Sequence, residues 1–342
     1  MRDEPPFDVV HCEQLQALPI AEPARRAGVA CVLRAQNVES AVWDVMADEA
    51  PAWRAAAMRV EAGRMRRFEA EAIGDVDATI ALSTDDAAAL AAMTPSASSR
   101  IRAVPPPIPS AWLAGGDRVA RDDRADRVGP DRAGADRAGE SAVVASVGVG
   151  KDSTFIWIGS AGWSPNDAAR RWLLDDIWPA ISARLPDARL HLFAAGAADA
   201  DAGAGAAEHG ERRSIAWRGS PRESGEAFMP GGILLIPMRA ASGVRMRVLE
   251  AWARRVPVIA SPAAMAGLDA QDGRDVLIAA DGRAFAEAAA QLASDPSLRA
   301  QLVEGGRATL ARRHDPRRIA EATLEVYRQA IEWRRAVQGE RR

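Results

Sequence analysis

The sequence is poor in lysine, cysteine and long apolar runs. Of its 44 lysine and arginine residues, all but Lys151 are arginine. Because this skew runs through the whole chain together with abundant alanine, we interpret it as a coding bias, and a single arginine is a weaker functional signal than usual. The net charge of −3 also argues against a nucleic-acid-binding surface.

The shortage of cysteine and of apolar runs limits where the protein can work. Only Cys12 and Cys31 are present, both on predicted strands, so a disulfide framework is excluded and we expect a buried, reduced pair. No stretch approaches the ~18 apolar residues of a membrane span, and the acidic, proline-bearing start is unlike a signal peptide. We expect a cytoplasmic location, with peripheral contact at the inner membrane face left open.

The chain does contain a regular alternation of strand and helix patterns on either side of a low-complexity stretch. Strands are predicted at 7–11, 29–35, 77–83, 100–109, 153–160, 188–196, 214–219, 232–237, 256–261 and 275–279. The longest predicted helices are at 51–74, 166–185, 297–313 and 315–337, and Thr84, Ser297 and Asp315 are predicted caps. Such alternation predicts parallel sheets covered by helices on both faces.

Residues 115–150 form the low-complexity stretch, in which Asp-Arg pairs repeat among glycine, alanine and proline. Since it has no apolar periodicity, we expect a disordered linker. A nucleic-acid-binding arm is the weaker alternative, because each arginine has an aspartate beside it. The linker divides the chain into a first domain at 1–114 and a second at 151–314, and we expect the last helix, 315–342, to pack back toward the first domain.

The segment "RAASGVRMRVLEAWARRVPVIAS" lies between two apolar runs of the second half. Ser242 and Gly243 fall where a helix would start, and free backbone N–H groups at a helix start favour an anion. Arg245 and Arg247 add fork-shaped donors that suit phosphate, while Glu250 could accept hydrogen bonds from the paired hydroxyl groups of a ribose. The pattern indicates a nucleotide-diphosphate site; the competing interpretation is a solvated Arg–Glu pair on an ordinary helix.

This segment resembles the donor-binding segment of retaining GT-B glycosyltransferases of the family 4 type. There, two glutamates separated by seven residues precede a "P-V-[VI]-A" strand; Glu250 matches the second glutamate, and Ser242 stands at the place of the first. One branch of that family has "GSGTRLKILEA"-like sequence, which "AASGVRMRVLEA" resembles, with Arg245 and Arg247 at its basic positions. The resemblance implies that Gly243 and the two arginines bind a diphosphate and that Glu250 binds the ribose.

Other stretches resemble successive parts of the same family. "FIWIGSAGW" and the helix after it are similar to the first βαβ unit of the donor domain, which implies donor contacts at Gly159 and Ser160. "DVVHCEQ", "RAQNVES" and "DATIALSTDDAAAL" resemble the acceptor domain, without the βα units that usually precede them. The resemblance implies an α/β fold of two Rossmann-like domains (GT-B), the first one incomplete, facing each other across a cleft.

Four further positions are cleft candidates, each with two interpretations. Asn37 and Glu39 match residues of a cleft-facing "HN-x-E" stretch, or they form a helix cap and a first-turn acid. Trp163 and Asn166 line the cleft, or they form a hydrophobic staple and an N-cap. Both interpretations stay open from the sequence.

The catalytic candidates are Gln36 and His11. Gln36 stands where many members of the resembled family have a histidine that assists at the reacting centre. His11 is the only histidine of the first half, and its plainer interpretation is a buried residue at a strand end.

The expected function is transfer of a sugar from a nucleotide-diphosphate sugar to a carbohydrate or lipid-linked acceptor, in polysaccharide or other glycoconjugate synthesis. Retention at the transferred sugar is implied by the resemblance only. The alternative is a non-catalytic relative that binds a sugar nucleotide or serves as a partner subunit. No cofactor or metal is expected, because no Asp-x-Asp sequence falls at a credible cleft position; "DAD" at 199–201 lies in a glycine- and alanine-rich loop.

Overall fold

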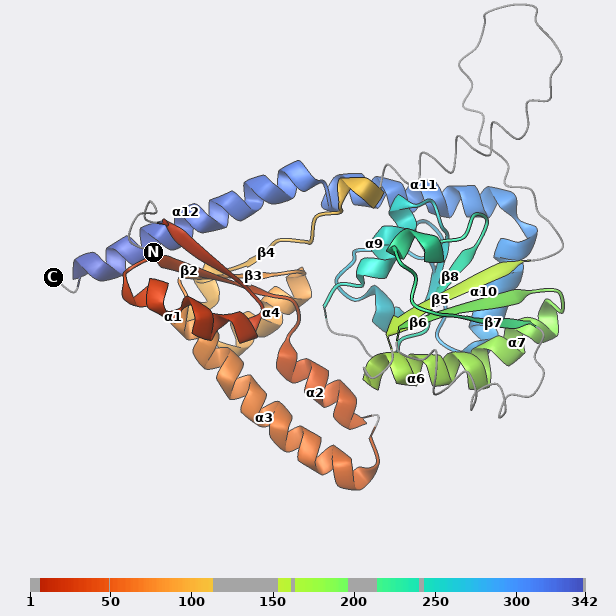
Figure 1. Cartoon of the computed structure of the whole chain (residues 1–342), viewed down its shortest axis with the longest axis horizontal. Coiled ribbons are helices and arrows are strands. Elements are labelled where there is room, and N and C mark those ends of the chain that lie inside the picture. The colour runs from red at the N-terminus through yellow and green to blue at the C-terminus, as the bar shows by residue number, and fades with distance from the viewer. Residues whose placement is uncertain are drawn as a thin grey trace, which may run out of the picture.

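The computed structural model describes residues 7–48, 50–112, 153–160, 164–195, 214–239 and 243–340. It has two α/β domains, each built on its own parallel sheet, which lie side by side in Figure 1. The expected linker at 115–150, Trp163 and Ser242 lie outside the described residues.

In the described part of the chain, the first domain has a four-stranded parallel sheet in the order β1-β2-β3-β4. Its strands, close to where the apolar runs predict them, are β1 (Val9–Glu13), β2 (Ala30–Ala35), β3 (Ala78–Ala81) and β4 (Ile101–Ala103). Its helices are α1 (Leu18–Arg26), α2 (Glu39–Asp48), α3 (Ala52–Asp75) and α4 (Thr84–Met93). Every residue of β3 is buried, as expected for a strand covered on both faces.

The two cysteines belong to the core of this first sheet. Cys12 on β1 and Cys31 on β2 are both buried and free, which confirms the expected reduced pair. Burial raises the pKa of the Cys31 thiol to about 12, so this thiol stays protonated and unreactive at neutral pH.

Among the described residues, the second domain has a six-stranded parallel sheet in the order β10-β9-β8-β5-β6-β7. Its strands are β5 (Thr154–Ser160), β6 (Arg189–Ala195), β7 (Ile215–Arg218), β8 (Ile233–Ile236), β9 (Val258–Ala260) and β10 (Leu277–Ile278). Its helices are α6 (Ser164–Trp172), α7 (Trp178–Arg184), α9 (Met246–Ala253), α10 (Gly282–Ser294) and α11 (Pro296–Arg313). The strand order reverses between β5 and β8, and sheets of this kind bind ligands beyond the carboxyl ends of the strands at such a point.

A π-helical turn, Leu173–Ile177, interrupts the helix predicted at 166–185. Pro179 follows this turn and has no backbone N–H, so the carbonyl group four residues earlier loses its usual donor. The irregularity was predictable from that proline. The structure adds that α6 already begins at Ser164, so Asn166 lies inside the helix and its interpretation as an N-cap is wrong.

Two helix starts differ from their predicted caps. Ser83, not Thr84, caps α4, and its hydroxyl oxygen accepts a hydrogen bond at 3.0 Å from a backbone N–H of the first turn. Asp295, not Ser297, caps α11 in the same way at 2.9 Å. A capping residue needs extended backbone just before the first turn, and both predicted residues already lie inside it. Asp315 is confirmed, since its carboxylate accepts from a first-turn N–H at 2.9 Å.

The last helix, α12 (Pro316–Glu340), runs from the second domain back across the first sheet, as the blue ribbon in Figure 1 shows. Its buried face packs Ile319, Val326 and Ala330 against side chains of β2 and β3. An ion pair between Arg334 and Asp77, with 2.9 Å between nitrogen and oxygen, fixes its far end. Although α12 is long, none of the described helices has the length and apolar character needed to cross a membrane.

Candidate functional site

Predicted site residues follow both strands that flank the strand-order reversal of the second sheet. β5 ends at Ser160, and the chain after β8 leads to Gly243 at the neighbouring strand end. Asn166 fixes the end of β5, because its side-chain amide donates to Ser160 Oγ at 2.9 Å and to the Ser160 carbonyl at 3.2 Å. At Gly159 an added Cβ would collide with the ring of Trp157 on the same face of the strand, so packing alone accounts for that glycine.

Gly243 forms a contact between the two domains. Its φ of +73° lies in the left-handed region that favours glycine. A Cβ placed there would lie 2.6 Å from the carbonyl oxygen of Gln36 and even closer to Asn37 Oδ1. Any other residue would therefore strain the backbone and push the first domain away, so the sequence needs glycine here for two separate reasons.

Arg245 and Arg247 follow Gly243 at the start of α9. Burial lowers the pKa of Arg245 to about 10, and the neighbouring charge of Arg247 acts in the same direction, while Asp86 of the first domain opposes it. Burial also lowers the pKa of Arg247, opposed by Glu250. Both guanidinium groups are thus charged but poorly solvated at neutral pH, a state that an arriving anion would stabilise.

A second interdomain contact joins the start of α4 to Gly267, whose φ is +76°. A Cβ on Gly267 would lie 2.8 Å from Ser83 Cβ. Asp86, in the first turn of α4, receives a hydrogen bond from the Ser83 hydroxyl at 2.8 Å. Burial raises the pKa of its carboxyl, opposed by that bond and by Arg245. Sequence analysis assigns this stretch to a helix start and to the acceptor-like domain, and it missed the position of Asp86 beside Arg245.

Glu250 is held in a fixed position inside α9, where it is only 5 % exposed. Its Oε1 accepts hydrogen bonds from the Ser224 hydroxyl at 2.5 Å and from Arg254 Nε at 2.9 Å. Its Oε2 takes no hydrogen bond from any residue that the structure describes. Ser224 and Arg254 were missed by sequence reasoning; the spacing of four residues between Glu250 and Arg254 was the available signal for the second.

Asn37 and Glu39 occupy the loop and first turn that lead into α2. Asn37 faces Gly243, whereas Glu39 is the first residue of the helix. The helix start is capped from α3: the buried Glu69 carboxylate accepts from the backbone N–H groups of Glu39 at 2.5 Å and Ser40 at 2.9 Å. Burial raises the pKa of the Glu39 carboxyl, and the charge of Glu69 acts in the same direction.

His11 and Gln36 are connected through Glu13, the last residue of β1. His11 Nε2 lies 3.1 Å from Glu13 Oε1, and Gln36 Nε2 donates to Glu13 Oε2 at 2.5 Å. The other ring nitrogen of His11 lies 2.8 Å from the Tyr327 hydroxyl of α12. The structure thus places Gln36 against Gly243 through its backbone, while its side chain bonds within the first domain.

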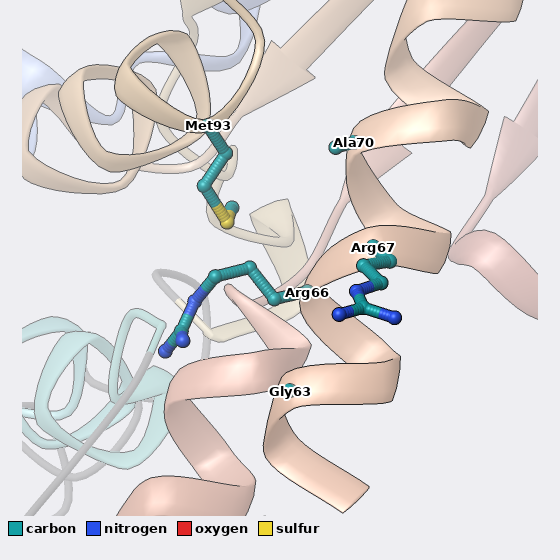
Figure 2. Close-up of a pocket in the computed structure, with 5 residues that line it drawn as sticks. All are labelled: Gly63, Arg66, Arg67, Ala70 and Met93. Atoms are coloured by element: carbon teal, nitrogen blue, oxygen red, sulfur yellow. The ribbon is translucent and has the colours of Figure 1, made fainter.

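A groove of about 410 Å³ lies nearby on the first domain, between α3 and the end of α4 (Figure 2). It is lined by Gly63, Arg66, Arg67, Ala70 and Met93. Arg66 is paired with Asp44 of α2 at 2.7 Å, while Arg67 forms no ion pair within the described part of the chain. The Ser40 hydroxyl lies 3.8 Å from Met93 Sδ, so the groove adjoins the start of α2 and carries a net positive charge at its rim.

Metal-ligating side chains do not converge in the described regions: no three His, Cys, Asp or Glu side chains there could hold one ion. Separately, Arg245 and Arg247 supply positive charge beside Gly243.

Comparisons with known proteins find a family match for the second domain and similar folds for almost the whole chain. Residues 152–295, from just before β5 to the end of α10, match the family described as Glycosyl transferases group 1. HepE from Anabaena, solved in complex with UDP and glucose, superposes with a TM-score of 0.65 at 12 % identity, over 93 % of this chain and 77 % of that one. The chain has a GT-B fold.

Two further GT-B structures are similar to the same extent. Sucrose-phosphate synthase from Thermosynechococcus elongatus gives a TM-score of 0.66 at 16 % identity, over 94 % of this chain and 73 % of that one. The α,α-trehalose 6-phosphate synthase from Burkholderia multivorans gives 0.60 at 14 % identity, over 99 % and 74 %. No curated protein matches the chain. The two Rossmann-like domains expected from the sequence are thereby confirmed.

Proposed function

We propose that this GT-B chain transfers a sugar from a nucleotide-diphosphate sugar to a carbohydrate acceptor. The observation that carries the proposal is the grouping of Gly243, Arg245, Arg247 and Glu250 beside the strand-order reversal of the second sheet, where the two domains meet. The match of residues 152–295 to Glycosyl transferases group 1 supports it.

The two arginines would bind the diphosphate. Guanidinium groups form bidentate, charge-assisted hydrogen bonds with phosphate, and these bonds strengthen where water is excluded. The negative charge on the diphosphate grows as its bond to the sugar breaks, so Arg245 and Arg247 would stabilise the transition state more than the bound donor. Burial lowers the pKa values of both arginines, and a bound anion would offset that cost by stabilising their charged forms.

Glu250 would bind the ribose. Its Oε1 is already held by Ser224 and Arg254, which fixes the carboxylate plane. Ribose hydroxyl groups would donate to Oε2, the oxygen without a partner among the described residues. A fixed carboxylate loses little entropy when the ligand binds, which favours affinity.

Finer features of the proposal depend on the resemblance of "AASGVRMRVLEA" to the family 4 type. They are a hexosyl donor, retention at the transferred carbon, an acceptor in polysaccharide or other glycoconjugate synthesis, and a cytoplasmic location. A lipid-linked acceptor would add contact with the membrane surface. We also propose transfer without a metal ion, since two arginines face the leaving diphosphate.

Nucleotide binding is the direct test. Titration of UDP, GDP and ADP by calorimetry should find one nucleotide that binds, and Glu250→Gln should weaken it by about tenfold, the loss of one to two hydrogen bonds. Glu304→Gln is the matched control, because Glu304 is exposed on α11 and Arg255 is its single ion-pair partner in the described part of the chain. The donor assignment is wrong if no nucleotide binds, or if both variants behave like the wild type.

One observation favours a second candidate, a non-catalytic relative that binds a sugar nucleotide. Gln36 stands where the resembled family has a histidine, and an amide cannot exchange a proton near neutral pH. UDP release from UDP-glucose separates the two candidates. Turnover supports the transferase, whereas tight binding with no release over many hours supports the non-catalytic relative.

A further inference from the structure

Four polar side chains form one hydrogen-bonded group at the carboxyl edge of the first sheet: His11, Glu13, Arg34 and Gln36. We call this group the edge cluster. His11 and Glu13 lie on β1, Arg34 is the register partner of Glu13 on β2, and Gln36 follows β2. The cluster borders the second domain, because the Gln36 backbone lies against Gly243.

Glu13 is the centre of the edge cluster. Its Oε1 accepts from His11 Nε2 and from an Arg34 guanidinium nitrogen, both at 3.1 Å, and its Oε2 accepts from Gln36 Nε2 at 2.5 Å. A carboxylate offers about four acceptor positions. Three donors from this chain therefore fix Glu13 and leave room for one more.

His11 contacts Glu13 through one ring nitrogen and Tyr327 through the other. With the proton on Nε2, its ring donates to Glu13 and accepts from the hydroxyl of Tyr327, the chain's single tyrosine, at 2.8 Å. The two rings also meet edge to face, with 5.6 Å between centroids. Both ring nitrogens of His11 already have hydrogen-bond partners. Another side chain of the edge cluster is therefore better placed to bind a ligand.

Exposure identifies that group. The side chains of His11 and Arg34 are 22 % and 19 % exposed, whereas that of Glu13 is 50 % exposed. Partial burial alone would raise the pKa of the Glu13 carboxyl, but Arg34 and His11 more than offset it and leave this pKa below its usual range. Glu13 is thus an ionised acceptor of hydrogen bonds whose open side faces solvent beside the interdomain contact.

The chemistry of this group selects its ligand. An ionised carboxylate accepts from hydroxyl groups and repels phosphate and carboxylate groups. We propose that Glu13 binds the acceptor substrate through a hydroxyl group of a neutral polyhydroxylated compound, and that His11, Arg34 and Tyr327 are positioning residues for Glu13. This inference rests on the proposed function, because an acceptor exists only in a transfer reaction.

Saturation-transfer NMR with free sugars tests the proposal on the full chain, with and without UDP. Glucose, galactose, mannose and N-acetylglucosamine are the neutral probes, and glucose 6-phosphate is the anionic counterpart. We expect at least one neutral sugar to bind, glucose 6-phosphate to bind more weakly than glucose, and Glu13→Gln to weaken the neutral sugar by about tenfold. The affinity for UDP should change by less than about twofold.

Three further variants separate binding from a structural role. Glu61→Gln is the matched control, since Glu61 on α3 is half-exposed and, among the described residues, pairs with Arg64 alone. Glu13→Asp keeps the charge and should give an intermediate loss. Tyr327→Phe leaves Glu13 in place and should weaken the sugar by about two- to threefold, through a looser His11. Glu13→Asp also carries the test if Glu13→Gln melts at a much lower temperature than the wild type.

Two results overturn the proposal: no neutral sugar binds, or the sugar that binds is unaffected by Glu13→Gln. Equal or tighter binding of glucose 6-phosphate overturns the choice of a neutral ligand. Failure of the proposed function looks different. In that case no nucleotide binds, while the sugar still depends on Glu13.

Discussion

The charged side chains on the two sides of the interdomain contact are in opposite electrostatic environments. On the second domain, Arg245 and Arg247 are charged groups that burial destabilises, as their lowered pKa values show. On the first domain, Glu13 is a half-exposed charge that its neighbours stabilise, and its pKa is lowered for that reason. Half-buried cations gain much from an anionic ligand, whereas a half-exposed carboxylate repels anions and accepts hydrogen bonds from donors such as hydroxyl groups. The difference suggests an interface that binds the charged substrate on one side and the neutral one on the other.

Among these tests, the largest effect is expected from replacing both arginines, which should remove the anion affinity of the second-domain side. Hydrogen bonds to charged groups contribute about 1.5–3 kcal/mol each. The double variant Arg245→Ala/Arg247→Ala should therefore bind the nucleotide selected by the titration of UDP, GDP and ADP at least about 100-fold more weakly by calorimetry. The control is Arg283→Ala, which removes an exposed arginine of α10. An affinity for that nucleotide within about threefold of the wild type would contradict the diphosphate assignment.

The contact itself can be disturbed at Gly243. Gly243→Ala should lower the free energy of unfolding by about 1–3 kcal/mol, because the left-handed backbone resists a side chain and the new Cβ meets Gln36 and Asn37. Gly63→Ala in α3 is the matched control, since an added Cβ there meets nothing within 4 Å. It should stabilise the helix by about 0.5–1 kcal/mol. Urea unfolding measures both, and equal effects would show that the Gly243 contact is not restrictive.

Acid titration should give opposite signs for two carboxyl groups at the interface. The pKa of Glu13 is lowered, so its contribution to stability is present above its unfolded pKa and is lost as pH falls through the folded value. The pKa of Asp86 is raised by burial, so its ionised form costs stability at neutral pH and this cost disappears in acid.

At pH 7, therefore, Glu13→Gln should lower the melting temperature and Asp86→Asn should raise it. Both differences in melting temperature should shrink toward zero in acid. The corresponding changes in the free energy of unfolding should each stay below about 1 kcal/mol because the groups are partly exposed. Thermal melts from pH 3 to pH 7 measure this. A shift of the same sign for both variants would contradict the asymmetry.

The smallest effect is expected from metal removal. If Arg245 and Arg247 offset the charge of the diphosphate, dialysis against EDTA should change the affinity for the nucleotide that binds by less than about twofold. Calorimetry before and after dialysis measures this. Restoration of lost affinity by Mg²⁺ or Mn²⁺ would show that a cation shares the site with the arginines.

Local patterns were enough to predict the strands and most helices. Apolar runs such as "GILLIP" and "VPVIAS" become β8 and β9 because a parallel strand covered on both faces needs apolar residues throughout. Cap positions were less reliable: Thr84 and Ser297 were chosen by residue type, but a cap depends on where the backbone stops being extended.

In the candidate site, too, local features were predictable and long-range contacts were not. Gly243, Arg245, Arg247 and Glu250 could be found from sequence, because a helix start, its charges and its spacing all lie within one short segment. Their partners could not. Ser224 reaches Glu250, and Asp86 reaches Arg245, only after elements distant in the sequence have packed together.

By itself, then, the sequence determined the α/β alternation, the reduced cysteines and the grouping of Gly243, Arg245, Arg247 and Glu250 in one segment, because each depends on neighbours along the chain. Only the tertiary structure decided which face of the first domain meets that segment and that Glu13, rather than His11, is the exposed group of the edge cluster. The physical reason is that exposure and charge balance depend on Arg34 of a neighbouring strand and Tyr327 of the last helix, which folding alone brings to Glu13 and His11.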